Sequence, residues 1–126
     1  MKQVISTSLA PQAIGPYSQA VRVGNTIYLS GQVGFNPATM SLVSEDFAAQ
    51  AEQTFKNINA VVTACGATLA EIAKLTIYVT DLSEFSKLNE VMANYFKQPY
   101  PARTTIQVSA LPRGAKVEIE GIVIIA

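Results

Sequence analysis

Short runs of alternating apolar and polar residues, each suited to a half-buried β-strand, recur along the chain. They occupy residues 18–23, 26–31, 75–80, 103–108 and 117–125. The first two runs are separated by Gly24-Asn25, a pair that favours the tight turn of a two-residue hairpin. The last two are joined by a segment that contains the turn-forming residues Pro112 and Gly114, so we expect a second hairpin there.

Two other segments carry apolar residues three or four positions apart, which is the spacing of one helix face. The first follows Ser44-Glu45-Asp46, which supplies an N-cap and acidic residues for a first turn, and Gly66 is suited to end it. Its apolar stripe comprises Phe47, Ala51, Phe55, Ile58, Val62 and Cys65. The second helix is expected to start at Asp81 and to end before Pro99. Its stripe comprises Phe85, Leu88, Met92 and Tyr95 or Phe96.

This order of elements predicts an α+β fold in which two helices pack on one face of a mixed sheet, while the other face stays bare. Apolar residues make up 49% of the 126 residues and charged residues only 14%, and the mean hydropathy is +0.26. Such an excess suits a closed oligomer, for example a trimer, that buries the bare face; a well-filled core is the alternative. The length fits a single domain over residues 1–126.

The composition also restricts the chemistry. Nine basic and nine acidic residues occur without a block of either sign, which argues against nucleic-acid binding. There is no histidine, so a metal site is not expected, and the single Cys65 is interpreted as an inert core thiol. No apolar run approaches about 20 residues and no signal-peptide pattern is present, so we expect no membrane association and a cytoplasmic protein.

Three charged residues, Arg103, Glu118 and Glu120, lie in runs that are otherwise typical of buried strands. The two glutamates are two positions apart and therefore share a face, and Arg103 shares its face with Thr105. Pairing of the two strands as a hairpin would put these side chains on one polar face. Because an isolated ionised group in an apolar interior is strongly disfavoured, this face either lines a wet pocket or holds internal ion pairs.

Two segments nearer the N-terminus supply further candidates. Residues 14–17 are typical of a bend that fixes Tyr17, either as a core aromatic residue or at a pocket. At Ser30-Gly31 the glycine either lets the backbone approach a ligand closely or marks a plain bulge. Asn89, within the second predicted helix, is interpreted as a solvated or packed polar residue.

Several short motifs together resemble the RidA/YjgF family of reactive-intermediate (imine/enamine) deaminases, a family also known as endoribonuclease L-PSP. The resemblance extends over nearly the whole chain. It is carried by residues 13–20 (AIGPYSQA), 29–32 (LSGQ), Asp81-Leu82 with Phe85 and Asn89, 101–104 (PART), Leu111-Pro112 and 117–120 (VEIE).

The resemblance implies a chorismate-mutase-like α+β fold, a homotrimer and pockets at the subunit interfaces. It assigns binding of the substrate carboxylate to Arg103 and handling of the hydrolytic water to Glu118. It implies a pocket lined by Tyr17, Ser30, Gly31 and Thr105. Thr105 stands where the family often has cysteine, and we expect this difference to affect substrate preference.

The implied reaction is the hydrolysis of 2-imino acids, such as 2-iminobutanoate and 2-iminopropanoate, to 2-oxo acids and ammonia. No metal or organic cofactor is expected, because a protonated imine is already a good electrophile. Partial burial would raise the pKa of Glu118 and Arg103 would lower it, while Glu120 is expected to serve as scaffold. The alternative is a trimer that binds small carboxylates, such as 2-oxobutanoate, without turnover. RNA cleavage, attributed to some family members, has no basic patch to support it.

Overall fold

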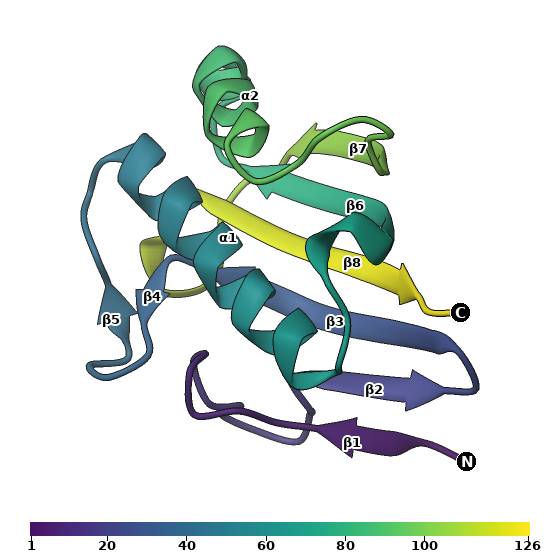
Figure 1. Ribbon diagram of the computed structural model, residues 1–126. Helices are drawn as coiled ribbons and strands as arrows, with labels where there is room; N and C mark the ends of the chain where they lie inside the picture. Colours follow the sequence, from purple (N-terminus) through teal and green to yellow (C-terminus); the bar gives the residue numbers. More distant parts are fainter.

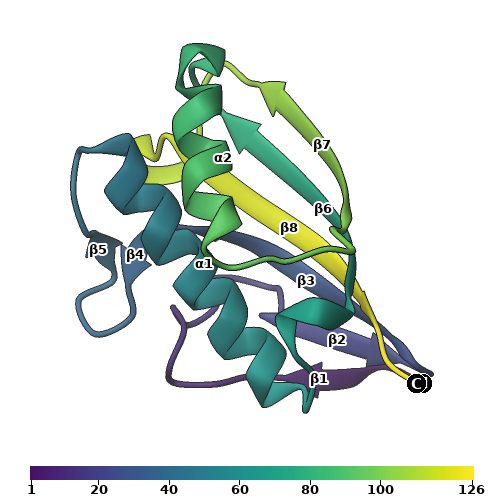
Figure 2. The same ribbon diagram turned by 45° about the horizontal axis from the view of Figure 1, so that its top comes forward.

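The computed structural model describes residues 1–126 and contains one six-stranded mixed sheet with both long helices on the same face (Figure 1 and Figure 2). The strand order is β1-β2-β3-β8-β6-β7, and every neighbouring pair is antiparallel except β6 and β7. The strands span Gln3–Ile5 (β1), Ala20–Val23 (β2), Thr26–Val33 (β3), Ile72–Val79 (β6), Ala102–Gln107 (β7) and Val117–Ile124 (β8). The helices are Phe47–Ala64 (α1) and Phe85–Ala93 (α2).

Smaller elements complete the chain. Strands Phe35–Asn36 (β4) and Ser41–Leu42 (β5) form a short hairpin between β3 and α1, and Met40 has a positive φ of 57° at its turn. Three single-turn 3₁₀ helices cover Leu69–Glu71, Leu82–Glu84 and Pro112–Gly114.

Most of the predicted elements are confirmed, with changes at their ends. The β2–β3 hairpin turns at Gly24, which has a φ of 62°. Asp46 rather than Ser44 is the N-cap of α1, since its carboxylate accepts the Ala49 N–H at 2.9 Å. Helix α2 ends earlier than predicted, and the two aromatic residues that follow it pack their rings on Phe55 of α1.

The predicted hairpin of residues 103–108 and 117–125 is wrong. Strand β7 pairs in parallel with β6, and β8 pairs with the other edge of β6, so β6 separates the two strands that were expected to be partners. Turn-forming residues between two strands indicate that the chain reverses its direction. They do not indicate whether a third strand lies between the two strands in the sheet. The run Leu75–Val79 is rich in β-branched and aromatic residues, and it occupies this more central position.

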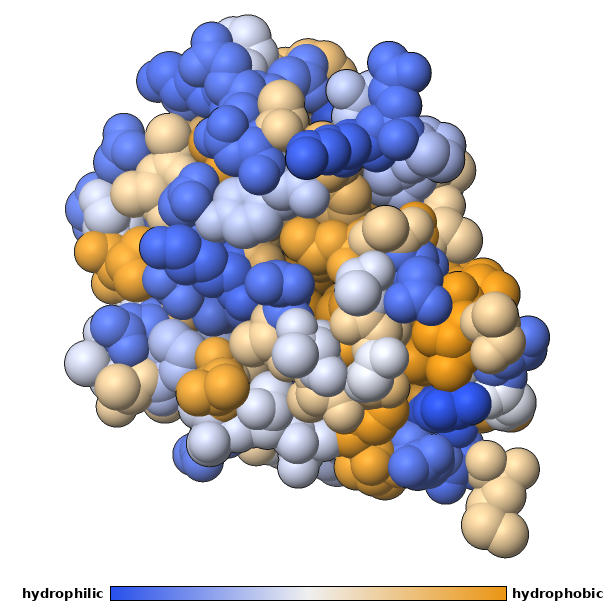
Figure 3. Space-filling view, viewed as in Figure 1, coloured by the Kyte–Doolittle hydropathy of each residue, from blue (hydrophilic) through white to orange (hydrophobic).

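The core lies between the sheet and the helices. It is a cluster of 23 buried residues in which Leu75, Ile77 and Ile119 of the sheet contact the apolar stripes of α1 and α2. Cys65 lies at its margin, and burial raises the pKa of its thiol, which agrees with an inert role. On the helix-covered side, shown in Figure 3, hydrophilic residues gather over α2, and apolar residues gather toward the end of the sheet that carries the termini.

The opposite face of the sheet carries no helix, as predicted (Figure 2). Its strands expose apolar side chains, of which Val4 is 64% exposed, Tyr28 49% and Ile124 45%. These residues belong to β1, β3 and β8, so the apolar surface extends over most of the sheet. Polar side chains are concentrated on this face toward the start of β8.

Candidate active site

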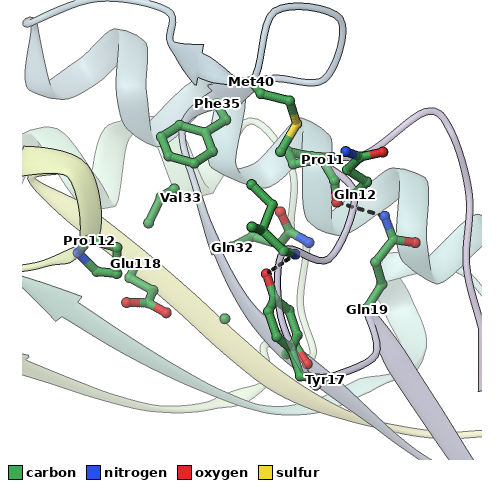
Figure 4. Close-up of a pocket in the computed structure, with 13 residues that line it drawn as sticks. Pro11, Gln12, Tyr17, Gln19, Gln32, Val33, Phe35, Met40, Pro112 and Glu118 are labelled. Atoms are coloured by element: carbon green, nitrogen blue, oxygen red, sulfur yellow. Dashed lines mark hydrogen bonds between the residues drawn. The ribbon is translucent and has the colours of Figure 1, made fainter.

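Glu118 lies near the start of β8, on the open face of the sheet, opposite Val33 of β3 and Tyr78 of β6. Its side chain is partly buried and borders a pocket of about 420 Å³. The pocket is formed by the end of β3, the β4–β5 hairpin, the turn at Pro112 and the loop that precedes β2 (Figure 4). Glu118 is therefore a half-buried acidic group with access to solvent through the pocket.

A bulge in β3 brings the backbone of Gly31 against this carboxylate. The register between β3 and β8 shifts between Leu29 and Gln32, so that Ser30 and Gly31 form an irregularity in the ladder. A β-carbon added to Gly31 would clash with a carboxylate oxygen of Glu118 and lie 2.9 Å from its Cδ. The bulge expected at Gly31 is confirmed, and the group that approaches its backbone is the Glu118 side chain of the same chain, while approach to a ligand stays a prediction.

The pKa of Glu118 is raised, first because burial disfavours the ionised form and second because the Glu120 carboxylate lies on the same face of β8. Glu120 accepts a hydrogen bond from the hydroxyl of Tyr78 at 2.6 Å, which fits the predicted scaffold role. The expected lowering of the Glu118 pKa by Arg103 is wrong for the single chain, because Arg103 does not contribute to it.

Internal ion pairing, the alternative for the charged strands, does not occur within the chain. The one salt bridge joins Lys87 to Glu84 on the surface. Neither Arg103 nor Glu118 has an oppositely charged group within 4.0 Å. Both side chains are therefore available to a ligand or to another chain.

Tyr17 and Ser30 border the same pocket as Glu118, as the resemblance implied. Tyr17 is 52% exposed, so it is not a core aromatic residue, and its hydroxyl accepts the Ile14 N–H at 3.3 Å. That hydroxyl keeps its own proton free to donate to a ligand. Ser30 instead donates its hydroxyl proton to the Ser18 carbonyl, so its side chain mainly fixes the wall of the pocket.

Gln19 holds the loop that forms one side of the pocket, a role that the sequence did not reveal. Its carboxamide is buried, accepts the Thr7 N–H at 2.7 Å, and donates to the Thr7 and Pro11 carbonyls at 3.1 and 2.7 Å. It also donates to the Ala10 carbonyl at 3.4 Å. A buried glutamine with its hydrogen bonds satisfied in this way acts as a structural tether.

Arg103 lies in a different pocket, of about 330 Å³, which is bordered by α2 and by Tyr100 and Pro101. Its guanidinium donates to the Asn89 side-chain oxygen at 2.8 Å and lies 5.1 Å from the centre of the Phe85 ring. Asn89, interpreted from the sequence as a solvated or packed polar residue, is exposed and in addition holds the guanidinium of Arg103. The usable signal was the spacing of Phe85 and Asn89, since residues four apart on a helix present one face.

Arg103 and Glu118 do not share a site within one chain. Arg103 lies opposite Leu75, whose side chain faces the helices, whereas Glu118 lies opposite Tyr78 on the open face. They are two strand spacings apart across the sheet and three residues apart along it, which gives roughly 14 Å between their Cα atoms. The predicted single polar face is wrong, because it required β7 and β8 to be neighbours.

Thr105 follows Arg103 on the same face of β7. Its hydroxyl oxygen is buried and has no hydrogen-bond partner, and the residue borders none of the pockets of the single chain. No group of three or more acidic or cysteine side chains is arranged to hold a metal ion. Neither helix is long and apolar enough to cross a membrane.

The geometry can be compared with known proteins. The family model described as endoribonuclease L-PSP matches residues 7–125. The chain belongs to this family, also called RidA/YjgF. Among curated RidA/YjgF relatives, the 2-iminobutanoate/2-iminopropanoate deaminase of Dermatophagoides farinae is 50% identical, with 98% of this chain and 97% of that protein covered. The human protein of the same name is 45% identical, with 98% and 90% covered.

Solved RidA/YjgF structures agree with the fold described above. RidA from the Antarctic bacterium Psychrobacter sp. PAMC 21119 superposes with a TM-score of 0.95 at 54% identity, covering 98% of this chain and 99% of that chain. The structure of Escherichia coli TdcF with bound serine superposes with a TM-score of 0.93 at 38% identity, covering 98% and 99%. The α+β fold with two helices on one face of a mixed sheet is thus that of the family.

Proposed function

We propose that this protein hydrolyses 2-imino acids, such as 2-iminobutanoate and 2-iminopropanoate, to 2-oxo acids and ammonia. The observation that carries the proposal is the half-buried Glu118, whose pKa is raised, in the same open pocket as Tyr17, whose hydroxyl proton is free to donate. The deaminase names of relatives that are 45–50% identical support the same reaction.

In the proposed mechanism Glu118 acts as the general base. Its carboxylate takes a proton from a water molecule while the water oxygen bonds to the imine carbon, which gives a tetrahedral carbinolamine. Starting from the protonated imine, Glu118 then returns the proton to the amino nitrogen and takes the hydroxyl proton as the C–N bond breaks. The oxygen becomes the carbonyl of the 2-oxo acid, ammonia leaves, and Glu118 releases the remaining proton to solvent. A raised pKa suits this exchange, because the carboxylate must both accept and release a proton.

Arg103 is the proposed binding residue for the substrate carboxylate. A guanidinium can donate two parallel hydrogen bonds to a carboxylate and thereby fix the orientation of the imine carbon. Within the chain the Cα atoms of Arg103 and Glu118 are roughly 14 Å apart and the two side chains lie on opposite faces of the sheet, so one small 2-imino acid cannot reach both. A site that uses both residues therefore needs two chains.

We accordingly propose a homotrimer in which the Arg103 pocket of one chain meets the Glu118 pocket of the next. The exposed apolar residues of the open sheet face supply surface for such an assembly. In this arrangement Thr105 lies beside the carboxylate-binding group and contributes to the substrate site. The reaction is proposed to need no metal or organic cofactor, because the protonated imine is itself electrophilic. We propose that the protein is cytoplasmic, because it would encounter there the enamines that dehydratases release.

A second function deserves testing because Arg103 and Asn89 form a pocket without Glu118. A trimer with this pocket alone would bind small carboxylates, such as 2-oxobutanoate, without turnover. The related TdcF structure contains bound serine, which is also a small carboxylate.

The deciding experiment generates 2-iminobutanoate from threonine with a pyridoxal-phosphate-dependent dehydratase and traps the remaining imine with semicarbazide. The wild-type protein is expected to reduce the amount trapped, and Arg103→Ala and Glu118→Gln are expected to abolish this effect. Unchanged trapping with the wild-type protein rejects the deaminase. Calorimetric titration with 2-oxobutanoate then tests the carboxylate-binding alternative.

A further inference from the structure

Met40 has a backbone conformation that a bulky residue rarely adopts. Its φ of 57° lies in the left-handed region, where a β-carbon crowds the backbone and glycine is the usual residue. Met40 ends the loop of residues 37–40 between β4 and β5, and its N–H donates to the Asn36 carbonyl at 2.8 Å. The hairpin therefore holds a large side chain at a position where that side chain adds strain.

The Met40 side chain lines the Glu118 pocket. It also packs against a small apolar cluster that is separate from the main core, and this cluster consists of the buried residues Val33, Phe35 and Ala115. Two of these residues, Val33 and Phe35, line the pocket as well. The strained residue thus adds its thioether to an apolar wall of the pocket.

Val33 fixes the position of this cluster relative to Glu118. The two residues lie directly opposite each other in the β3–β8 ladder. Opposite residues of an antiparallel pair project from the same face of the sheet, with their β-carbons about 4.5–5.5 Å apart. The apolar cluster therefore begins beside the Glu118 carboxylate on the open face, and Figure 4 shows Phe35 and Met40 on the side of the pocket away from Tyr17.

The pocket therefore has a polar end and an apolar end, and a 2-imino acid has the same division. The carbon that water attacks carries the C=N group and also the alkyl side chain. When Glu118 activates the water, this carbon lies close to the carboxylate, and the alkyl side chain can extend along the same face toward Val33 and Met40. Burial of the alkyl side chain against the apolar wall is favourable.

We propose that Met40 is a specificity-determining residue that limits the length of the substrate side chain; this inference rests on the deaminase function proposed above. The thioether closes the apolar end of the pocket, so a methyl or ethyl side chain fits between Glu118 and Met40, whereas an isobutyl side chain meets the thioether. Glycine at position 40 would suit the loop without strain and would leave this end open. The strain of Met40 is therefore explained by the discrimination that its side chain provides.

The test compares two imines that are made by the same enzyme. A flavin-dependent L-amino-acid oxidase converts 2-aminobutanoate and leucine to 2-imino acids with an ethyl and an isobutyl side chain, while O₂ is reduced to hydrogen peroxide that catalase removes. Semicarbazide traps the remaining imine. Met40→Gly and Met40→Ala are each expected to raise the kcat/KM for the leucine-derived imine, relative to that for 2-iminobutanoate, by about tenfold or more.

Two controls separate the side chain of Met40 from the backbone of its loop. Both Met40 variants lack the thioether, but only glycine relieves the strain, so Met40→Gly is expected to have the higher urea unfolding midpoint of the two. Arg113 is the matched control, because it also has a positive φ, of 58°, and follows Pro112 at the same pocket, while its own side chain does not line the pocket. Arg113→Gly is expected to leave the preference between the two imines unchanged.

The outcomes separate this inference from the proposed function. A wild-type protein that hydrolyses neither imine overturns both. With an active wild type, an unchanged preference in both Met40 variants overturns the role of Met40 alone. A preference that changes in Met40→Gly but not in Met40→Ala, or changes equally in Arg113→Gly, assigns the effect to the loop backbone and also overturns the inference. A lower midpoint for Met40→Gly than for Met40→Ala shows that the loop does not need a positive φ, which overturns it as well.

Discussion

Arg103 and Glu118 lie on opposite faces of one sheet, with β6 between the strands that carry them. Each residue borders its own pocket, and no ion pair joins them. The chain thus presents a cationic pocket backed by α2 and an acidic pocket on the open face. The proposed trimer brings the Arg103 pocket of one chain against the Glu118 pocket of the next. This proposal can be tested by mixing two variant chains.

Co-refolding of Arg103→Ala with Glu118→Gln is expected to restore activity that neither variant has alone. If every site in a trimer takes Arg103 from one chain and Glu118 from the next, random mixing of equal amounts should return about a quarter of the wild-type activity. The measurement is imine hydrolysis by the mixture against each variant refolded alone. A mixture as inactive as its components would show that both residues act from the same chain or that one has no role.

Gly31→Ala is expected to lower kcat by about 100-fold, because a methyl group at this position displaces the Glu118 carboxylate and small misplacements of catalytic groups are costly. Gly24→Ala is the matched control. Gly24 has positive φ in the β2–β3 turn and no atoms near its missing β-carbon, so this change should cost about 1 kcal/mol of stability and leave kcat intact. Equal kcat values for Gly31→Ala and Gly24→Ala would show that the close approach of Gly31 to the Glu118 carboxylate does not matter for catalysis.

The pH dependence of kcat/KM should report Glu118 as a base. Because its pKa is raised, activity is expected to fall on the acidic side at a pH above the usual range of glutamate. Glu120→Gln removes the like charge and should move this acidic limb to lower pH. The pH profiles of kcat/KM of the wild type and of Glu120→Gln are compared. If the acidic limb lies at the same pH in both proteins, the Glu120 carboxylate does not raise the pKa of Glu118.

The same shift has a consequence for stability. The folded chain holds the Glu118 proton more tightly than the unfolded chain does, so its contribution to stability is present below the unfolded pKa and is lost as pH rises through the folded pKa. Glu118→Gln is therefore expected to be more stable than the wild type at pH 7, with the difference vanishing near pH 3. Urea unfolding at the two pH values measures this, and a destabilised variant at pH 7 would show that the ionised carboxylate has stabilising contacts.

Asn89 is expected to position Arg103 without neutralising it. Its side-chain oxygen accepts a guanidinium N–H at 2.8 Å and carries no charge that competes with a substrate carboxylate. Asn89→Asp should pair with Arg103 and raise KM by about tenfold or more, whereas Asn89→Ala should raise it less. Steady-state kinetics and inhibition by 2-oxobutanoate measure both changes, and identical KM values for Asn89→Asp and wild type would exclude this role.

Thr105→Val tests the buried hydroxyl of β7. Removing a hydroxyl oxygen that has no partner is expected to raise stability by about 1 kcal/mol. If Thr105 contributes to the substrate site of the assembled protein, KM should change in the same variant. Urea unfolding and imine kinetics give the two readouts, and a loss of stability would mean that the assembly supplies a partner for the hydroxyl.

Local patterns in the sequence predicted the strands and helices well, because hydrophobic spacing and turn residues act over a few positions. The Gly24-Asn25 hairpin and the apolar stripe of α1 are examples. The pairing of β7 was not predicted, because it depends on which of the other strands is the more favourable partner for β7 in the sheet. That single error placed Arg103 and Glu118 on one face.

The site residues show the same division between local and tertiary information. Tyr17, Ser30 and Gly31 were correctly grouped with Glu118 through a family resemblance, and all of them border its pocket. The partnership of Arg103 with Asn89 and the tether at Gln19 each join residues that are 8 to 14 positions apart along the chain. The helix spacing of Phe85 and Asn89 could show that they share a face, but not that Arg103 packs on it.

Both termini lie at the end of the sheet where β8 finishes (Figure 1 and Figure 2). Glu118 is near the start of β8, six residues before Ile124, which is roughly 20 Å along the strand. A tag, a linker or a solid support attached to either terminus would therefore leave the mouth of the Glu118 pocket uncovered. The protein is well suited to immobilisation in a flow reactor, where it could remove unstable imines directly downstream of the enzyme that releases them.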